Sequence, residues 1–174
     1  ILQNCIRNFS KFKTELDACN FLESEAKKRG CELSFYPIVA SGTNACEPHH
    51  IPDNRPIKKG FCVIDFGVRY KGYCSDITRT IYVGKPSKKE IEVYNFLMNV
   101  QKKAVQMVCK KNCGKLYDYA VKELGGMAKY FTHGLGHGIG VEIHEKPNIS
   151  LKSKDKFLPG MIFTIEPGIY TKKY

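Results

Sequence analysis

The chain has 174 residues, of which 43% are hydrophobic and 26% charged, and its formal net charge is +11. These values exclude a disordered tail and a collagen-like fibre, and no apolar run approaches the ~20 residues that a membrane span needs. The basic excess consists of scattered lysines without interleaved aromatic residues. This pattern favours a lysine-rich cytoplasmic surface over a nucleic-acid-binding one.

Eight cysteines form no CxxC pair, and no secretory signal precedes them. We therefore expect reduced, mostly buried thiols in a reducing cytoplasm rather than a disulfide framework. The chain also begins without an initiator methionine, so we expect a fragment or a processed form of a longer protein. The cysteines are Cys5, Cys19, Cys31, Cys46, Cys62, Cys74, Cys109 and Cys113.

The first 30 residues are predicted to be helical, because Thr14 and Asp17 have the spacing of a capping box ahead of helically spaced apolar residues. Arg29 and Gly30 mark the end of this helical region. Runs of apolar and β-branched residues predict strands over 33–40, 61–66 and 73–83, with a turn-rich stretch over 41–52.

Ser87 and Glu90 form a second capping box, ahead of a long amphipathic helix that we expect Gly114 to end. A shorter helix over 116–124 and strands over 131–143 and 161–170 follow. Helices and strands alternate without a βαβ fingerprint or a repeat, which indicates one α/β or α+β domain without an internal linker. The predicted apolar stripe of the long helix consists of Ile91, Tyr94, Leu97, Met98, Ala104, Val105 and Val108.

Asp65 lies within an apolar strand, where an unpaired carboxylate would be costly, and Asp76 follows eleven residues later. If a hairpin closes at Tyr70–Lys71, the two aspartates are direct cross-strand neighbours with Cβ atoms ~5 Å apart. A divalent metal ion between them would relieve their repulsion. The alternative is that one aspartate lies in the turn while the other pairs with Arg79.

Glycine occupies every second position around His133 and His137, which disfavours a helical zinc motif. In an extended chain these histidines share a face, and the glycines allow another backbone or a ligand to approach. His144 has the opposite parity and joins them only if the glycines introduce a bulge. Three histidines so close together favour a functional site over a structural role.

Glu166 is a further carboxylate in an apolar strand, and Pro167 ends the strand behind it. The alternative is a glutamate that pairs with a surface lysine. Two aspartates, one histidine and one glutamate together form a mixed oxygen and nitrogen ligand set, which suits Mn, Co, Fe or Zn.

Together these motifs resemble the pita-bread metallopeptidases, the family of methionine aminopeptidase, aminopeptidase P, prolidase and creatinase. The resemblance implies an α+β (mixed α/β) pita-bread fold, a curved antiparallel sheet flanked by helices with pseudo-two-fold symmetry, in one catalytic domain over 1–174. Ser75–Thr80 and Gly168–Tyr170 are most similar to the proline-directed branch. The segments that carry the resemblance are Asp65, Ser75–Thr80, His133–Gly140, His144–Pro147 and Thr164–Gly168.

By this resemblance two divalent metal ions, Mn or Co before Zn or Fe, are bound by four residues, with Asp76 bridging the ions. Glu166 is also expected to move a proton in catalysis. The resemblance further implies that His49 lines the substrate pocket, and that His133 and His144 bind substrate and stabilise the oxyanion. The implied metal ligands are Asp65, Asp76, His137 and Glu166.

The resemblance also implies features that these 174 residues do not include. The family's fifth ligand, a glutamate beyond the Glu-Pro-Gly motif, would follow Tyr174, and an N-terminal creatinase-like domain would precede Ile1. We therefore expect a catalytic domain that is truncated at both ends.

The implied activity is metal-dependent hydrolysis of the N-terminal bond of short peptides with proline in second position, by a hydroxide that the two ions share. Methionine aminopeptidase activity and a non-catalytic pita-bread binding module are the alternatives. We expect a cytoplasmic protein without nucleic-acid or membrane partners, which forms a homodimer at full length.

Overall fold

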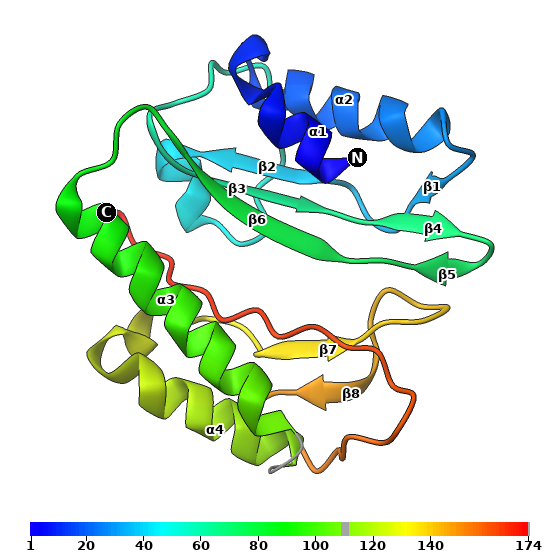
Figure 1. Ribbon diagram of the computed structural model, residues 1–174, viewed down its shortest axis with the longest axis vertical. Helices are drawn as coiled ribbons and strands as arrows, with labels where there is room; N and C mark the ends of the chain where they lie inside the picture. The colour runs from blue at the N-terminus through cyan, green and yellow to red at the C-terminus, as the bar shows by residue number, and fades with distance from the viewer. Residues whose placement is uncertain (109–111, 174) are drawn as a thin grey trace. The chain divides into compact units, whose positions relative to one another are not determined.

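The computed structural model describes residues 1–108 and 112–173, which form two compact units (Figure 1). Unit 1 consists of Ile1–Pro86 with Lys172 and Lys173, and unit 2 consists of Ser87–Thr171. Each unit buries a hydrophobic core of its own. The expectation of one catalytic domain over 1–174 stays a prediction.

Unit 1 opens with the helices α1 (Leu2–Arg7) and α2 (Glu15–Lys27), joined by the short η1 (Phe9–Lys11). The predicted capping box is confirmed: Asp17 N donates to Thr14 Oγ1 (3.1 Å), and Thr14 N donates to Asp17 Oδ2 (2.9 Å). Because the backbone N–H groups of Thr14 and Lys13 both donate to the charged carboxylate of Asp17, they lower its pKa below the usual value. The helical region ends near Gly30, as predicted.

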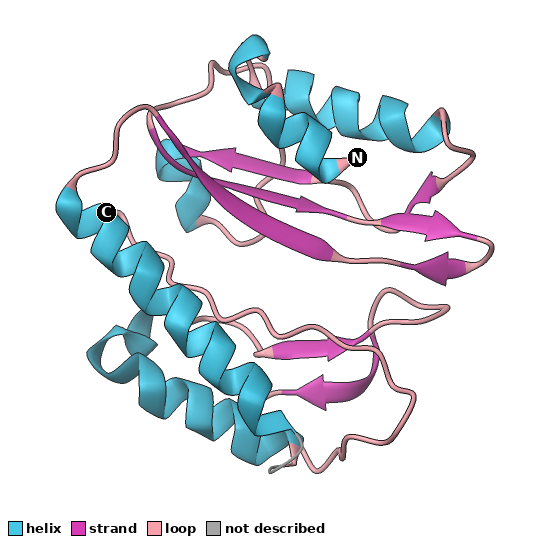
Figure 2. Ribbon diagram, viewed as in Figure 1, coloured by secondary structure: helices cyan, strands magenta, loops and turns pink. Residues whose placement is uncertain are grey.

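The strands of unit 1 form two antiparallel sheets of three, ordered β2–β3–β6 and β1–β4–β5 (Figure 2). Helices α1 and α2 lie over one face of the β2–β3–β6 sheet (Figure 1). Alternate β3 residues Cys62, Ile64 and Phe66 are buried in this core, so Asp65 points to the opposite face. The strands are β1 (Glu32–Leu33), β2 (Ile38–Ser41), β3 (Gly60–Phe66), β4 (Val68–Tyr70), β5 (Tyr73–Cys74) and β6 (Ile77–Val83).

Two predicted strands of unit 1 are interrupted. The strand expected over 33–40 is divided into β1 and β2 at Pro37, which has no N–H to donate to a neighbouring strand. The strand expected over 73–83 is divided into β5 and β6 at Ser75, whose hydroxyl accepts the N–H of Val68 (3.0 Å). The strand expected over 61–66 is confirmed as β3.

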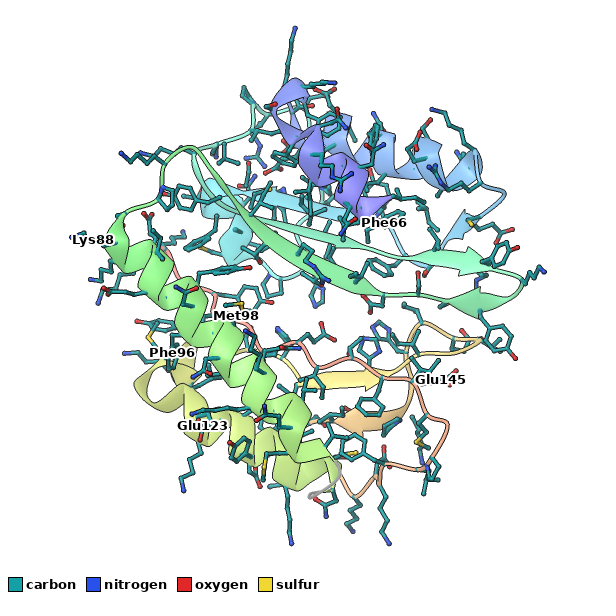
Figure 3. The ribbon with its side chains drawn as sticks, in the orientation of Figure 1. Phe66, Lys88, Phe96, Met98, Glu123 and Glu145 are labelled. Atoms are coloured by element: carbon teal, nitrogen blue, oxygen red, sulfur yellow. The ribbon has the colours of Figure 1, made fainter. Side chains whose placement is uncertain are left out.

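Unit 2 is built on two helices that pack against each other, α3 and α4. The predicted capping box forms at the start of α3, where Ser87 N donates to Glu90 Oε2 (2.6 Å). An ion pair between Lys103 Nζ and Glu123 Oε2 (2.6 Å) joins the helices, and Figure 3 labels Glu123 on α4. The elements are α3 (Lys88–Met107), α4 (Cys113–Leu124), η4 (Gly125–Tyr130), β7 (Gly136–Gly138) and β8 (Glu145–Ile149).

Two predictions about the helices of unit 2 are wrong. Gly114 does not end the long helix but is the second residue of α4, where a Cβ would lie 2.6 Å from the carbonyl oxygen of Ser153. The glycine therefore permits a close backbone contact. The predicted stripe of α3 is only half buried: Leu97, Ala104 and Val108 pack in the core, whereas the remaining members are exposed. These are Ile91, Tyr94, Met98 and Val105.

The cysteines bear out the expected chemistry as far as the structure describes them. The seven described cysteines are free thiols, and Cys109 lies outside the described residues. Burial raises the pKa of Cys5 and of Cys113 to about 11, so these thiols stay protonated near neutral pH. No helix within residues 1–108 and 112–173 is long and apolar enough to cross a membrane.

Candidate functional site

The two aspartates of unit 1 are not directly opposite each other. In the β3–β6 pair Asp65 faces Thr78, so the predicted pairing with Asp76 is wrong by two residues. The cause is the hairpin turn, which lies at Lys71 and Gly72, both with positive φ, rather than at Tyr70–Lys71.

Asp65 and Asp76 nevertheless share one face of the sheet. The β3–β6 and β4–β5 pairs have the same register. Asp76 is two residues before Thr78, the residue that faces Asp65, so Asp76 is a diagonal neighbour of Asp65. Diagonal neighbours have Cα atoms about 7–8 Å apart, which leaves both carboxylates within reach of one cation or an adjacent pair. Asp76 is half-buried, and Oδ1 of Asp65 is buried. The two aspartates are therefore diagonal neighbours on one face rather than the predicted direct pair.

In unit 2 the central strand is β7, which is bonded on both sides. It pairs with β8 on one side, with a shift in register between His137 and Gly138. On its other side lies the segment 162–166, so the strand predicted over 161–170 is present as a short ladder. The strand predicted over 131–143 is confined to β7, and β8 was not predicted. The ladder consists of Ile139 N to Ile162 O (2.9 Å), Thr164 N to His137 O (2.8 Å) and Glu166 N to Leu135 O (2.8 Å).

The glycines of β7 permit this close packing of three backbones. A Cβ at Gly136 would lie 2.1 Å from the carbonyl oxygen of Thr164, and one at Gly138 would lie 2.1 Å from that of Lys146. The expectation that these glycines let other backbone approach is confirmed. The segment that carries Glu166 is therefore held against the strand that carries His137.

Gly136→Ala should destabilise unit 2, because the added methyl group would have to displace the backbone at Thr164. We expect the free energy of unfolding to fall by about 1–3 kcal/mol, the usual cost of overpacking. Urea unfolding measures the effect. Gly126→Ala is the matched control, because nothing lies within 4 Å of a Cβ at Gly126. Equal unfolding midpoints for the two variants would contradict the proposed contact.

His137 and Glu166 form a pair that fits a divalent cation. Nδ1 of His137 lies 3.0 Å from the carbonyl oxygen of Gly138, which can only accept, so Nδ1 carries a proton. Nε2, the other ring nitrogen, lies 3.4 Å from Oε1 of Glu166. Metal-binding histidines commonly donate their other N–H to such a carbonyl.

Thr164 orients both members of this pair. Its hydroxyl accepts the backbone N–H of His137 (3.0 Å) and donates to Oε1 of Glu166 (2.6 Å). One side chain thus fixes the backbone of the histidine and the carboxylate of the glutamate. This role of Thr164 was not predicted from the sequence.

His144 lies beside His137 in unit 2, with ring centroids 4.3 Å apart. The chain turns over 140–144 before β8, and the register shift after His137 supplies the bulge that the parity of His144 required. The ring of His144 is exposed. It is therefore accessible to a ligand.

Both ring nitrogens of His133 have partners. Nδ1 donates to the carbonyl oxygen of Gly134 (2.7 Å), and Nε2 lies 2.9 Å from the hydroxyl oxygen of Tyr170. The Tyr170 ring lies against Gly168, where a Cβ would be 2.6 Å from it. Tyr170, seen before only as part of a motif, fixes the orientation of His133.

His49, on the loop after η2 (Gly42–Cys46) of unit 1, is exposed, as a substrate-binding side chain must be. The next residue, His50, is buried and lies 2.7 Å from a carboxylate oxygen of Glu15. No local sequence pattern predicts this buried pair, because the two residues are far apart in the chain.

Each unit contributes two of the four predicted metal ligands. Within either unit, the part of the chain that the structure describes brings together no group of three histidine, cysteine, aspartate or glutamate side chains able to hold a metal ion. Asp65 and Asp76 are neighbours in unit 1, and His137 and Glu166 are neighbours in unit 2.

Comparisons with known proteins point to one family. Residues 1–173 match the model of metallopeptidase family M24. An Xaa-Pro dipeptidase of Pyrococcus furiosus is 39% identical over 173 residues, 97% of this chain and 50% of that protein. The chain spans about half the length of the curated relatives it matches.

Solved structures agree with this match. The prolidase from Pyrococcus horikoshii OT3 has a TM-score of 0.87 at 39% identity, over 92% of this chain and 48% of that one. An Xaa-Pro dipeptidase from Bacillus anthracis has a TM-score of 0.87 at 37% identity, over 98% of this chain and 50% of that one. The mixed helix and antiparallel-sheet fold of pita-bread type, expected from the motifs, is confirmed.

Proposed function

Because this chain belongs to metallopeptidase family M24, we propose that its protein hydrolyses the N-terminal bond of short peptides with proline in second position. The observation that carries the proposal is the His137–Glu166 pair, in which Nε2 of His137 lies 3.4 Å from Oε1 of Glu166. The names of the relatives, Xaa-Pro dipeptidase and prolidase, support this substrate class.

The proposed ligands of two divalent metal ions are Asp65, Asp76, His137 and Glu166. Three carboxylates and one imidazole form a donor set that suits Mn or Co, and also Zn or Fe. When bound, such ions supply Lewis acidity that polarises the scissile carbonyl and lowers the pKa of a water molecule.

Side chains of this protein would then carry out the proton transfers. Glu166 takes a proton from the attacking water and passes it to the leaving nitrogen, while Thr164 holds Oε1 in place. An imide nitrogen before proline has no N–H, so it must receive a proton to leave. His144 is the better donor to the developing oxyanion, because both ring nitrogens of His133 already have partners.

The remaining assignments complete the proposal. His49 and His133 bind the peptide, residues 1–174 belong to one catalytic domain, and the protein acts in the cytoplasm as a homodimer. It needs neither a membrane nor a nucleic-acid partner, which agrees with its scattered lysines.

Substrate preference tests this proposal. The full-length protein loaded with Mn or Co should cleave peptides with proline in second position about ten times faster, or more, than Met-Ala or Met-Gly peptides, a difference of about 1.4 kcal/mol in activation free energy. A side-by-side assay of initial rates measures it. Faster cleavage of Met-Ala would favour a methionine aminopeptidase, and no cleavage of either set by the metal-loaded protein would favour a binding module.

A further inference from the structure

A buried polar cluster joins the start of α2 to the loop after β2. It consists of Glu15, Ser41, Asn44 and His50, and we call it the Glu15 cluster. The carboxylate of Glu15, only 1% exposed, accepts hydrogen bonds from every other member. These bonds are Ser41 N (2.6 Å) and Ser41 Oγ (2.8 Å) to Oε1, Asn44 Nδ2 to Oε1 (3.0 Å) and Oε2 (3.1 Å), and His50 Nε2 to Oε2 (2.7 Å).

The ring of His50 lies between two carboxylates. Its Nε2 lies 2.7 Å from Oε2 of Glu15, whose carboxylate also accepts the four hydrogen bonds from Ser41 and Asn44, and 3.3 Å from Nδ2 of Asn44. On its other side, Nδ1 lies 3.7 Å from Oε2 of the exposed Glu47. Hydrogen bonds to an ionised, desolvated carboxylate are the stronger kind, and a fully satisfied network specifies one geometry.

All donors of the Glu15 cluster come from one short loop, 41–50. Its backbone is folded onto itself, since Glu47 N donates to Asn44 O (2.9 Å) and His50 N donates to Glu47 O (3.2 Å). Its start is also tied to the next segment, where Lys58 N donates to Ser41 Oγ (3.0 Å). The loop is therefore held at both ends, and its last anchored residue is His50.

His49 is the exposed neighbour of this anchor. The side chain of His50 is inserted beside α2, and the side chain of His49 remains at the surface. Any shift of His50 must move the backbone of His49 as well, because the two residues share a peptide bond.

We propose that Glu15 and His50 are positioning residues, which hold His49 in the orientation it needs to bind the peptide. This inference rests on the proposed function, in which His49 contacts the substrate. A hydrophobic anchor would stabilise the loop equally well, but a non-directional contact fixes no single backbone geometry. The Glu15 cluster thus acts through His49 rather than on the substrate.

A double-mutant cycle in the full-length, metal-loaded protein separates this role from a merely structural one. His50→Ala should lower kcat/KM for a peptide with proline in second position by about 10-fold to 100-fold, as misplacement of a substrate-positioning group does. In a His49→Ala background the same change should have little further effect, because the residue it positions is gone. Losses that multiply in the double mutant would overturn the proposal, since independent sites are additive in free energy.

Two further variants sharpen the comparison. His50→Gln should restore kcat/KM to within about threefold of the parent, because its amide N–H can donate to Glu15. Glu25→Gln is the matched control, a buried carboxylate of the same helix that pairs with Lys28 and Arg29, and should leave kcat/KM unchanged. A loss in the control as large as in His50→Ala would overturn the proposal.

Amide hydrogen exchange gives a readout that does not depend on activity. His50→Ala should accelerate exchange over 42–50 by about 10-fold or more, while His50→Gln and Glu25→Gln should not. If His50→Ala does not fold, Asn44→Ala removes two hydrogen bonds of the cluster and should act in the same direction. Unchanged exchange over 42–50 in His50→Ala would overturn the inference. If exchange is faster in His50→Ala but the parent protein cleaves no peptide with proline in second position, only the proposed function is overturned.

Discussion

Glu166→Gln should lower turnover of a peptide with proline in second position by ~10² or more, equivalent to about 2.7 kcal/mol of transition-state stabilisation. Glutamine retains the shape and can still accept the hydroxyl proton of Thr164, but it cannot take a proton from water at neutral pH. Steady-state kinetics of the full-length protein, with metal content measured on the same samples, give the result.

Glu123→Gln is the matched control for this experiment. Glu123 is a carboxylate of the same unit whose ion pair with Lys103 joins α3 and α4 and has no part in the proposed chemistry. Near-parental turnover in Glu166→Gln, with metal retained, would show that another group moves the proton.

Asp76→Asn should abolish bound metal. The proposed bridging position needs a negative charge shared by two cations, and asparagine keeps the shape while removing that charge. Its diagonal neighbour Asp65 would then be the one proposed metal-binding carboxylate left in unit 1. Elemental analysis after dialysis against metal-free buffer measures the ions per chain.

Asp53→Asn provides the comparison, because Asp53 is a carboxylate of unit 1 whose partner is Arg55. This variant should keep its metal. If Asp76→Asn binds as much metal as the parent, the idea of two ions bridged by Asp76 is wrong.

Local patterns predicted the features that depend on nearby residues. Both capping boxes form as expected, because the hydroxyl and the carboxylate are three residues apart and need no tertiary support. The strand β3 is likewise visible as an apolar run in the sequence, which indicates burial on both faces, whereas only one face is fully buried. The family followed from short motifs with specific spacing, and the same motifs supply the proposed metal ligands.

The register of the aspartates shows where such patterns fail. When the hairpin turn moves by one residue, the residue that faces Asp65 changes by two positions. The position of the turn is indicated in the sequence by Gly72, which follows Lys71. A two-residue turn with positive φ at both positions prefers glycine in its second place. Placing the turn on this glycine would have given the observed pairing.

Other features have no local signal at all. Glu15 occupies the first turn of a helix, where an acidic residue is usual and exposed, yet here it is buried by a loop that begins 26 residues later. Similarly, Gly114 has the composition of a helix breaker but lies in α4 against Ser153. Only the tertiary fold gives these residues their roles.

The separate cores of unit 1 and unit 2 have a thermodynamic consequence. Because each unit buries its own apolar side chains, one can open without exposing the core of the other, and a single melting temperature then describes only the weaker unit. Spectroscopic probes placed in each unit should therefore report separate melting transitions.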